Sequence, residues 1–315
     1  MQHTEKQQKH TQNTPDEAEG IPDNSPDACR GSDKPAPLPR LPRLPRLPRL
    51  PRLPRNARLP INRCNLPADV LGGLTFQRHP APLLIDGVLN LHRGLFERLD
   101  RLPSPAERGE LFLAHMDAHF CLTHPIDAGA DHPGARVRAN WRKVLQGWSF
   151  DSESRDGALL KGWVESRFGL LPRHHREPLP APEGPAWTRY LHERSSGLYA
   201  TNALEAQIDL LYAYTQHELT RAHGPDAHLT LYRGVNALNA HDILARPTRQ
   251  HATLLLNNLS AFSASRERAD EFGDTVLTAR IPTAKILAYS ELLPGLLRGE
   301  AEYLVIGGLC EVEIG

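Results

Sequence analysis

Cysteine is scarce in this 315-residue chain, and none of its four cysteines forms a CxxC pair. They are Cys29, Cys64, Cys121 and Cys310. This scatter excludes a disulfide framework and a cysteine-based zinc site. Long apolar runs are also missing, because no stretch of about 18 apolar residues exists and Met1–Lys6 opens no apolar segment. The sequence therefore predicts a soluble cytoplasmic protein with neither a membrane span nor a secretory signal.

Two common nucleotide-binding signatures are absent as well. No GxGxxG follows a predicted strand and no GxxxxGK[ST] occurs, which argues against a Rossmann site and a P-loop. An excess of charge of one sign is also lacking, since 37 Lys and Arg residues balance 37 Asp and Glu residues. Residues 61–315 carry a net charge of −4. Such a body does not indicate a dedicated nucleic-acid binder.

Residues 1–60 contain little that could form a core. Residues 1–33 are polar and carry −4, so they cannot bury enough apolar surface to offset the entropy of ordering. Residues 38–55 are six Leu-Pro-Arg triplets, which exclude helix and central strand and favour an extended polyproline-II rod. The segment 34–60, which contains these triplets, carries a charge of +8 and could bind an anionic surface or a domain that recognises PxxP motifs. The simpler interpretation is a repeat that is tolerated because it lies in a solvated tail. We predict a disordered tail over 1–60 and a folded domain over 61–315.

Apolar periodicity divides the folded domain into a helical part, 61–225, and a β-rich part, 226–315. The expected helices cover about 89–99, 104–120, 139–150, 158–168, 186–194 and 201–223, with a Pro-rich loop over 171–186. The expected strands are 229–235, 259–263, 275–281, 286–289, 303–306 and 310–314, with one short helix over 265–273. Helices followed by short strands favour an α+β fold with a mainly antiparallel sheet.

Two short signals in the β-rich part carry residues capable of chemistry. Tyr232-Arg233-Gly234 places a guanidinium, which can hold a diphosphate through two hydrogen bonds, beside a glycine that lets a ligand approach the backbone. Phe262-Ser263-Ala264-Ser265 offers a small polar face that fits under a ribose, and Ser265 also suits a helix N-cap. Each signal has an ordinary explanation: an edge arginine paired with an acid, and a strand followed by a cap.

The third signal, Glu300-Ala301-Glu302, is the most informative. The strand period places both carboxylates on one face, where they repel unless cations or donors converge on them. A solvated edge is the alternative, and we expect that role for Glu311-Val312-Glu313, which has the same spacing. The preceding turn-rich loop, 291–299, holds apolar residues that must pack on the core or meet a partner. Its notable members are Leu292, Leu293, Leu296, Leu297 and Arg298.

Histidines offer a weaker signal. His115 and His119 lie four residues apart on a predicted helix, with His124 near, and could bind a metal. HExxH is absent, no acid-and-cysteine set lies close, and 16 histidines make chance pairs common. We therefore expect no metal site and no metal in the chemistry. A metal-dependent hydrolase is the least favoured alternative.

Together, the three signals resemble the Arg–Ser–Glu motif set of mono-ADP-ribosyltransferases related to cholera-toxin-like enzymes. Ile61–Pro67, Ile85–Val88 and the overall layout extend the resemblance to the bacterial dinitrogenase reductase ADP-ribosyltransferase family, over about residues 61–315. One departure is the middle motif, which reads Ser-Ala-Ser where the wider class often has Ser-Thr-Ser. The leading serine, Ser263, is kept.

The resemblance implies a split β-sandwich of ADP-ribosyltransferase type, with NAD as co-substrate. Arg233 would hold the NAD phosphates or the nicotinamide ribose, and Ser263 would position that ribose and brace Glu302. Glu302 would be the catalytic glutamate, and Glu300 would orient the target arginine and help to deprotonate it. Loop 291–299 would recognise the target protein. Further NAD contacts are implied for Tyr232, Gly234 and Phe262.

The implied reaction moves ADP-ribose from NAD to an arginine of the nitrogenase iron protein (dinitrogenase reductase) in its ADP-bound form. That modification would inactivate the iron protein and switch off nitrogen fixation. PII-type signalling proteins are implied as regulators by the family and by no residue of this chain. Two alternatives stay open: an ADP-ribosyltransferase or NAD glycohydrolase with another target, and a non-catalytic NAD-binding interaction module.

Overall fold

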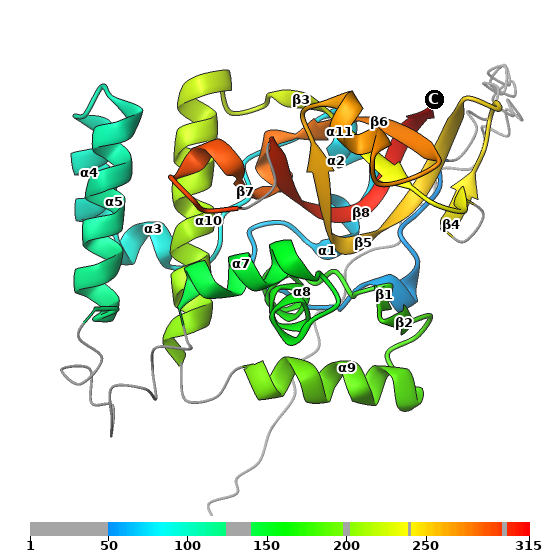
Figure 1. Ribbon diagram of the computed structural model, residues 1–315, viewed down its shortest axis with the longest axis horizontal. Helices are drawn as coiled ribbons and strands as arrows, with labels where there is room; N and C mark the ends of the chain where they lie inside the picture. The colour runs from blue at the N-terminus through cyan, green and yellow to red at the C-terminus, as the bar shows by residue number, and fades with distance from the viewer. Residues whose placement is uncertain (1–49, 124–139, 198–201, 239–240, 298–300) are drawn as a thin grey trace, which may run out of the picture. The chain divides into compact units, whose positions relative to one another are not determined.

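The N-terminal half of the chain is helical, as predicted, in a computed structural model that describes residues 50–123, 140–197, 202–238, 241–297 and 301–315 (Figure 1). The helical elements are η1 (Arg55–Ala57), α1 (Ala68–Leu71), α2 (Leu74–Arg78), α3 (Val88–Leu91), α4 (Arg93–Asp100), α5 (Pro105–Phe120), α7 (Trp141–Phe150), α8 (Arg155–Phe168), α9 (Gly184–Gly197) and α10 (Asn202–His223). The Pro-rich loop contains a two-stranded ribbon, β1 (His174–His175) and β2 (Glu177–Pro178). Within these residues, no helix has both the length and the apolar character needed to cross a membrane.

Local sequence sets the ends of several helices. Ser104 Oγ accepts a hydrogen bond from the Glu107 N–H, so α5 begins at Pro105, where the sequence predicted it. Ser154 caps α8 in the same way, which starts that helix three residues earlier than expected. The predicted helix over 89–99 is in fact two helices, because His92 adopts a non-helical conformation between α3 and α4.

The predicted antiparallel sheet is confirmed and is built from six strands. They are β3 (His228–Val235), β4 (Asp242–Ala245), β5 (His251–Ser263), β6 (Thr275–Pro282), β7 (Ile286–Tyr289) and β8 (Glu302–Ile314). Their order is β4-β5-β3-β6-β8-β7, and a further β5–β8 pairing closes four of them into a barrel. Short helical elements connect the strands: α11 (Arg266–Asp270), η3 (Thr283–Lys285) and η4 (Ser290–Leu292).

The observed strands differ from the predicted ones in three places. Strand β5 begins at His251 rather than residue 259, because residues 252–256 are buried on both faces and show no polar alternation. The short β4 carried no clear signal. The two strands expected over 303–306 and 310–314 are the single strand β8, which runs through Gly307-Gly308. A Cβ on Gly307 would lie 1.9 Å from the Asn257 carbonyl oxygen, so this glycine marks a close strand crossing rather than a turn.

The helical half and the barrel are joined by direct contacts. Helix α10 lies between α5 and β7 and touches both (Figure 1). The side-chain amide of Gln77 in α2 forms hydrogen bonds with both the carbonyl and the N–H of Glu311 in β8. Its Nε2 donates to the Glu311 carbonyl at 3.1 Å, and its Oε1 accepts from the Glu311 N–H at 2.7 Å. This side chain therefore binds β8 much as a neighbouring strand would.

The folded part starts earlier than the predicted boundary at residue 60. Leu53, in the last Leu-Pro-Arg triplet, and Ala57 are buried in the main hydrophobic core. The Leu171 N–H donates to the Ala57 carbonyl at 3.0 Å, and Arg58 pairs with Leu170 as an isolated bridge. The described part of the compact unit accordingly begins at Leu50. The rest of the expected tail, 1–49, lies outside the described residues.

We predict that deleting residues 1–49 and deleting residues 1–58 have different effects on stability. The longer deletion removes the buried Leu53 and Ala57, so it should lower the free energy of unfolding by about 3 kcal/mol relative to the shorter one. Chemical denaturation of both truncated proteins measures this difference. Equal midpoints would contradict the placement of Leu53 in the core.

Candidate active site

Three strands bring the Arg, Ser and Glu signals together at one end of the barrel. Tyr232 of β3 is the register partner of Ser263 in β5. Ser263 is in turn the register partner of Glu302, the first residue of β8. Segments about 30 and 40 residues apart in the chain are thus direct neighbours across hydrogen-bonded strands.

A pocket of about 600 Å³ opens over this junction. Its size lies within the range of small-molecule and cofactor sites. Six residues singled out from the sequence line it: Tyr232, Arg233, Gly234, Phe262, Ser263 and Glu302. The other walls come from residues without a sequence signal, chiefly Trp148, Phe150 and Ser152 from α7 and the turn after it, and Arg268 and Phe272 from α11 and its C-terminal side.

Arg233 supplies the pocket with a half-buried cation. Its Nη1 donates to the Ala261 carbonyl at 2.5 Å, and its guanidinium carbon lies 5.9 Å from the centre of the Phe262 ring. No ion pair joins it to a carboxylate within the described part of the chain, so the edge-arginine explanation is not observed there. Burial lowers the pKa of Arg233, and the Glu153 carboxylate offsets part of that effect. The side chain stays charged and can bind an anionic ligand.

Ser263 is fixed by the start of α11. Its Oγ accepts a hydrogen bond from the Ser265 N–H at 3.0 Å and keeps a proton that it can donate into the pocket. Ser265 forms the expected N-cap, since its Oγ accepts from the Arg268 N–H at 3.1 Å. Ser263 therefore forms part of the pocket wall, while Ser265 caps α11.

Glu302 is half-buried, and its backbone is held from both sides. Its N–H donates to Ser290 Oγ at 2.8 Å, and the Ser290 hydroxyl donates to its carbonyl at 3.2 Å. Ala301 precedes it with φ +54°, a left-handed conformation that is unusual for alanine. Strand β8 begins at Glu302, so the face on which Glu300 lies stays a prediction. Glu300 itself lies outside the described residues.

The second Glu-x-Glu pair differs from the first. Glu311 forms an ion pair with Arg78 of α2 at 2.5 Å, and Glu313 is exposed. Both line a different hollow from the one described above. The expected solvated edge is only partly observed, because Glu313 is exposed, Glu311 is half-buried and tied to the helical half, and β8 pairs here with both β5 and β6.

The leucines of the loop before Glu302 face inward. Leu292, Leu293, Leu296 and Leu297 are between 1% and 7% exposed and belong to the main core. A Cβ on Gly109 of α5 would lie 3.2 Å from Leu293, so the loop rests directly on that helix. In the described part of the loop, Glu291, Pro294 and Gly295 are the exposed residues. Arg298 lies outside the described residues.

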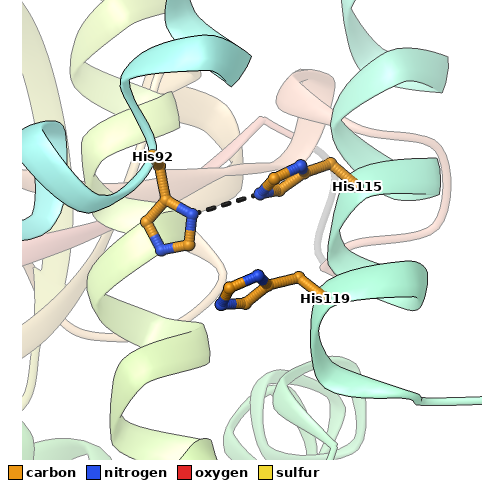
Figure 2. Close-up of side chains that lie close together, drawn as sticks. All are labelled: His92, His115 and His119. Carbon is orange, nitrogen blue, oxygen red and sulfur yellow. Dashed lines mark hydrogen bonds between the residues drawn. The ribbon is translucent and has the colours of Figure 1, made fainter.

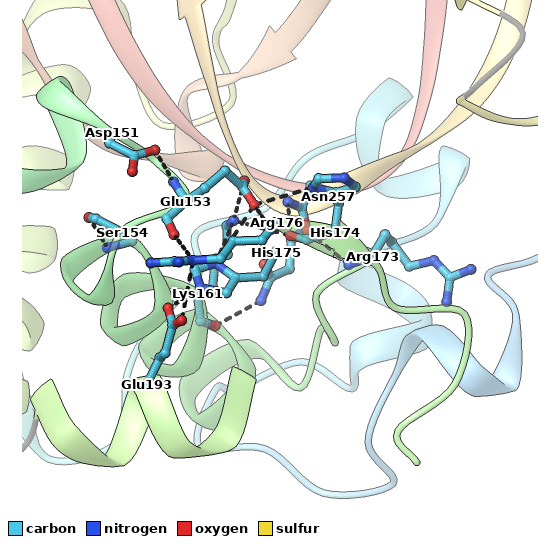
Figure 3. A network of polar contacts seen from close by, with 12 residues as sticks. Asp151, Glu153, Ser154, Lys161, Arg173, His174, His175, Arg176, Glu193 and Asn257 are labelled. Carbon is cyan, nitrogen blue, oxygen red and sulfur yellow. Dashed lines mark hydrogen bonds and ion pairs between the residues drawn. The ribbon is translucent and has the colours of Figure 1, made fainter. Parts of the chain in front are cut away.

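A buried polar network around Lys161 and Glu153 had no sequence signal (Figure 3). Lys161 of α8 is 1% exposed, and its Nζ donates to Glu153 Oε1 at 2.7 Å and to the His174 carbonyl at 3.1 Å. Although burial raises the pKa of Glu153, Lys161 and the Arg176 N–H hold it below its ordinary value. The network therefore keeps a fixed negative charge whose field reaches Arg233.

Comparison with known proteins shows which family the chain resembles. Residues 61–314 match the family described as dinitrogenase reductase ADP-ribosyltransferase (DRAT). An NAD(+)–dinitrogen-reductase ADP-D-ribosyltransferase of Rhodospirillum rubrum is 39% identical over 252 residues, which are 78% of this chain and 91% of that protein. No solved structure shows significant similarity to the chain.

Gly234 lines the pocket and also lies directly against α11. A Cβ at this position would lie 2.0 Å from the Ala269 carbonyl oxygen, so α11 fills the space that a side chain would need. The contact of Gly234 with NAD stays a prediction. We predict that Gly234→Ala pushes α11 off β3, lowers the free energy of unfolding by about 2–3 kcal/mol and weakens NAD binding. Denaturation and calorimetric titration with NAD measure the two effects.

The matched control is Gly94→Ala. That glycine lies in α4, and a Cβ there meets nothing within 4 Å. The control should leave NAD binding unchanged and stability unchanged or slightly higher. If Gly234→Ala behaves like Gly94→Ala, the contact with α11 does not shape the pocket.

Proposed function

This chain belongs to the dinitrogenase reductase ADP-ribosyltransferase family, and we propose that it transfers ADP-ribose from NAD to dinitrogenase reductase in the pocket between β3, β5 and β8. The observation that carries the assignment of the pocket is the register Tyr232–Ser263–Glu302. Arg233, which follows Tyr232, lines the same cavity as Ser263 and Glu302, so a cation, a hydroxyl and a carboxylate border it. These are the three groups that binding and cleaving NAD requires.

The NAD diphosphate binds Arg233 in this proposal. A guanidinium fork matches phosphate oxygens with two parallel hydrogen bonds, and Arg233 has no carboxylate partner among the described residues that would compete. Ser263 donates its hydroxyl proton to the nicotinamide-side ribose. Phe262, which already lies against the guanidinium, supplies an apolar surface beside the diphosphate.

Glu302 acts on the bond between nicotinamide and ribose. That bond breaks with its electron pair leaving on nicotinamide, and positive charge develops on the ribose, as in glycoside hydrolysis. A carboxylate below the ribose stabilises this charge, and the half-buried setting strengthens the effect. The two hydrogen bonds between Ser290 and the Glu302 backbone hold that backbone in place while positive charge develops on the ribose.

An arginine of dinitrogenase reductase then completes the transfer. One guanidinium nitrogen attacks the ribose carbon and loses a proton, which is difficult because the pKa of arginine exceeds about 12. Glu300, two residues before Glu302, is our candidate for orienting this group and accepting the proton late in the reaction. The loop over 291–299 lies next to these residues in the chain and would contact the target through its exposed positions. We retain the ADP-bound iron protein as the preferred target form and PII-type proteins as candidate regulators.

We predict that labelled NAD transfers its label to one arginine of purified dinitrogenase reductase in the ADP-bound form. Glu302→Gln should reduce this transfer at least about a hundredfold, because the charge that stabilises the oxocarbenium-like state is lost. Glu313→Gln is the control, since it removes an exposed carboxylate from the far end of the same strand and should leave the rate unchanged. The readout is label per iron protein, located by peptide mapping.

The same experiment separates the alternatives. NAD breakdown without label on the iron protein would support the proposed cleavage of NAD and indicate a target other than the iron protein. No NAD turnover under any condition would leave a non-catalytic NAD-binding module. Near-normal transfer by the Glu302→Gln variant would remove Glu302 from the catalytic position.

We predict a different pattern for Glu300→Gln. Because Glu300 acts on the acceptor and not on NAD, its replacement should reduce arginine transfer by about 10- to 100-fold while NAD hydrolysis in water falls much less. Parallel assays of label transfer and free nicotinamide release measure the ratio. Equal losses in both assays would contradict the acceptor role.

A further inference from the structure

Three histidines gather between helix α5 and the α3–α4 junction (Figure 2). His115 and His119 project from successive turns of α5, and His92 faces them from the non-helical junction between α3 and α4. One ring nitrogen from each lies within 4.8 Å of the other two. The shortest separation, between His92 Nδ1 and His115 Nε2, is 3.1 Å. The sequence offered His115 and His119 with His124 nearby, led us to expect no metal site, and gave no signal for His92; His124 lies outside the described residues.

The geometry is close to that of a tetrahedral site. Zinc–nitrogen bonds of about 2.0–2.1 Å place ligand nitrogens roughly 3.3 Å apart. The His92–His115 separation of 3.1 Å already matches this value, and the remaining separations, at most 4.8 Å, close with ring rotations. His92 is buried and His119 is exposed, so the cluster reaches from the interior to the surface.

We propose that His92, His115 and His119 form a binding site for one zinc-like divalent transition-metal ion, separate from the NAD pocket. Three imidazoles without a carboxylate favour Zn²⁺ or its neighbours over Mg²⁺ and Ca²⁺, which prefer oxygen ligands. None of the three residues lines the NAD pocket, so the ion takes no part in breaking NAD.

The position of the site indicates a structural role. An ion there ties the α3–α4 junction to the last two turns of α5. The same helix carries Arg108, whose Nη2 pairs with Glu218 Oε2 of α10 at 2.7 Å, and Gly109, which packs against Leu293. Metal binding therefore braces the helix on which the loop before Glu302 rests.

The test is zinc binding by the full-length, tag-free protein after chelator treatment. Competition with a chromophoric chelator should give one equivalent of bound zinc, and Co²⁺ should give the visible absorption of a tetrahedral site. Zinc at about a hundredfold excess over its Kd should raise the Tm by about 5 °C. A protein that binds no stoichiometric zinc, or a Co²⁺ spectrum without tetrahedral bands, would overturn the proposal.

His119→Ala is the decisive variant because this side chain is exposed and its removal should not disturb folding. It should weaken zinc binding at least about tenfold and abolish the rise in Tm. His192→Ala, an exposed histidine of α9, is the matched control and should bind zinc like the unmodified chain. Wild-type zinc affinity in His119→Ala would identify the cluster as packed aromatic rings, whose centroids already lie 4.8–5.5 Å apart.

Discussion

The antiparallel ladder between β5 and β8 is the constraint on which the active-site geometry depends. It runs from His251 opposite Glu313 to Ser263 opposite Glu302, and a register shift between Leu256 and Leu259 accommodates the close crossing at Gly307. A slip of one residue would turn every side chain of one strand to the other face. The burial of long stretches of both strands makes such a slip costly. The position of Glu302 beside Ser263 is therefore set by the core of the barrel rather than by the pocket itself.

The helical half does more than cover the barrel. Helix α7 and the turn after it form one wall of the pocket that we propose for NAD, and Glu153, in that turn, holds its charge through Lys161. Helix α5 supports the loop that leads to Glu302, and Gln77 joins α2 to the backbone of β8. A substitution outside the pocket can thus alter it, because side chains of the helical half are bonded to the backbone of the barrel or packed against it.

Local sequence rules placed many elements correctly. Ser104-Pro105 marked the start of α5, Gly224 followed the end of α10, and short strand-like runs identified β3 and β6. The same rules failed where burial removes alternation, as in residues 252–256, and where glycine permits a close crossing inside a strand, as at Gly307. They also placed the boundary of the folded part too late, because a Leu-Pro-Arg triplet looks alike whether its leucine is solvated or, like Leu53, buried.

The sequence by itself determined the chemical groups: an arginine, a serine and a glutamate in a fixed order, each at a strand end, with the family resemblance that gives them a reaction. Only the tertiary structure decided which groups meet. The closing of the barrel put Tyr232, Ser263 and Glu302 side by side, and packing turned the loop leucines inward onto α5. The approach of the α3–α4 junction to α5 brought His92 to His115 across 23 positions of the chain. Such contacts join residues distant in sequence, and their geometry follows from the packing of the whole core, which no local spacing records.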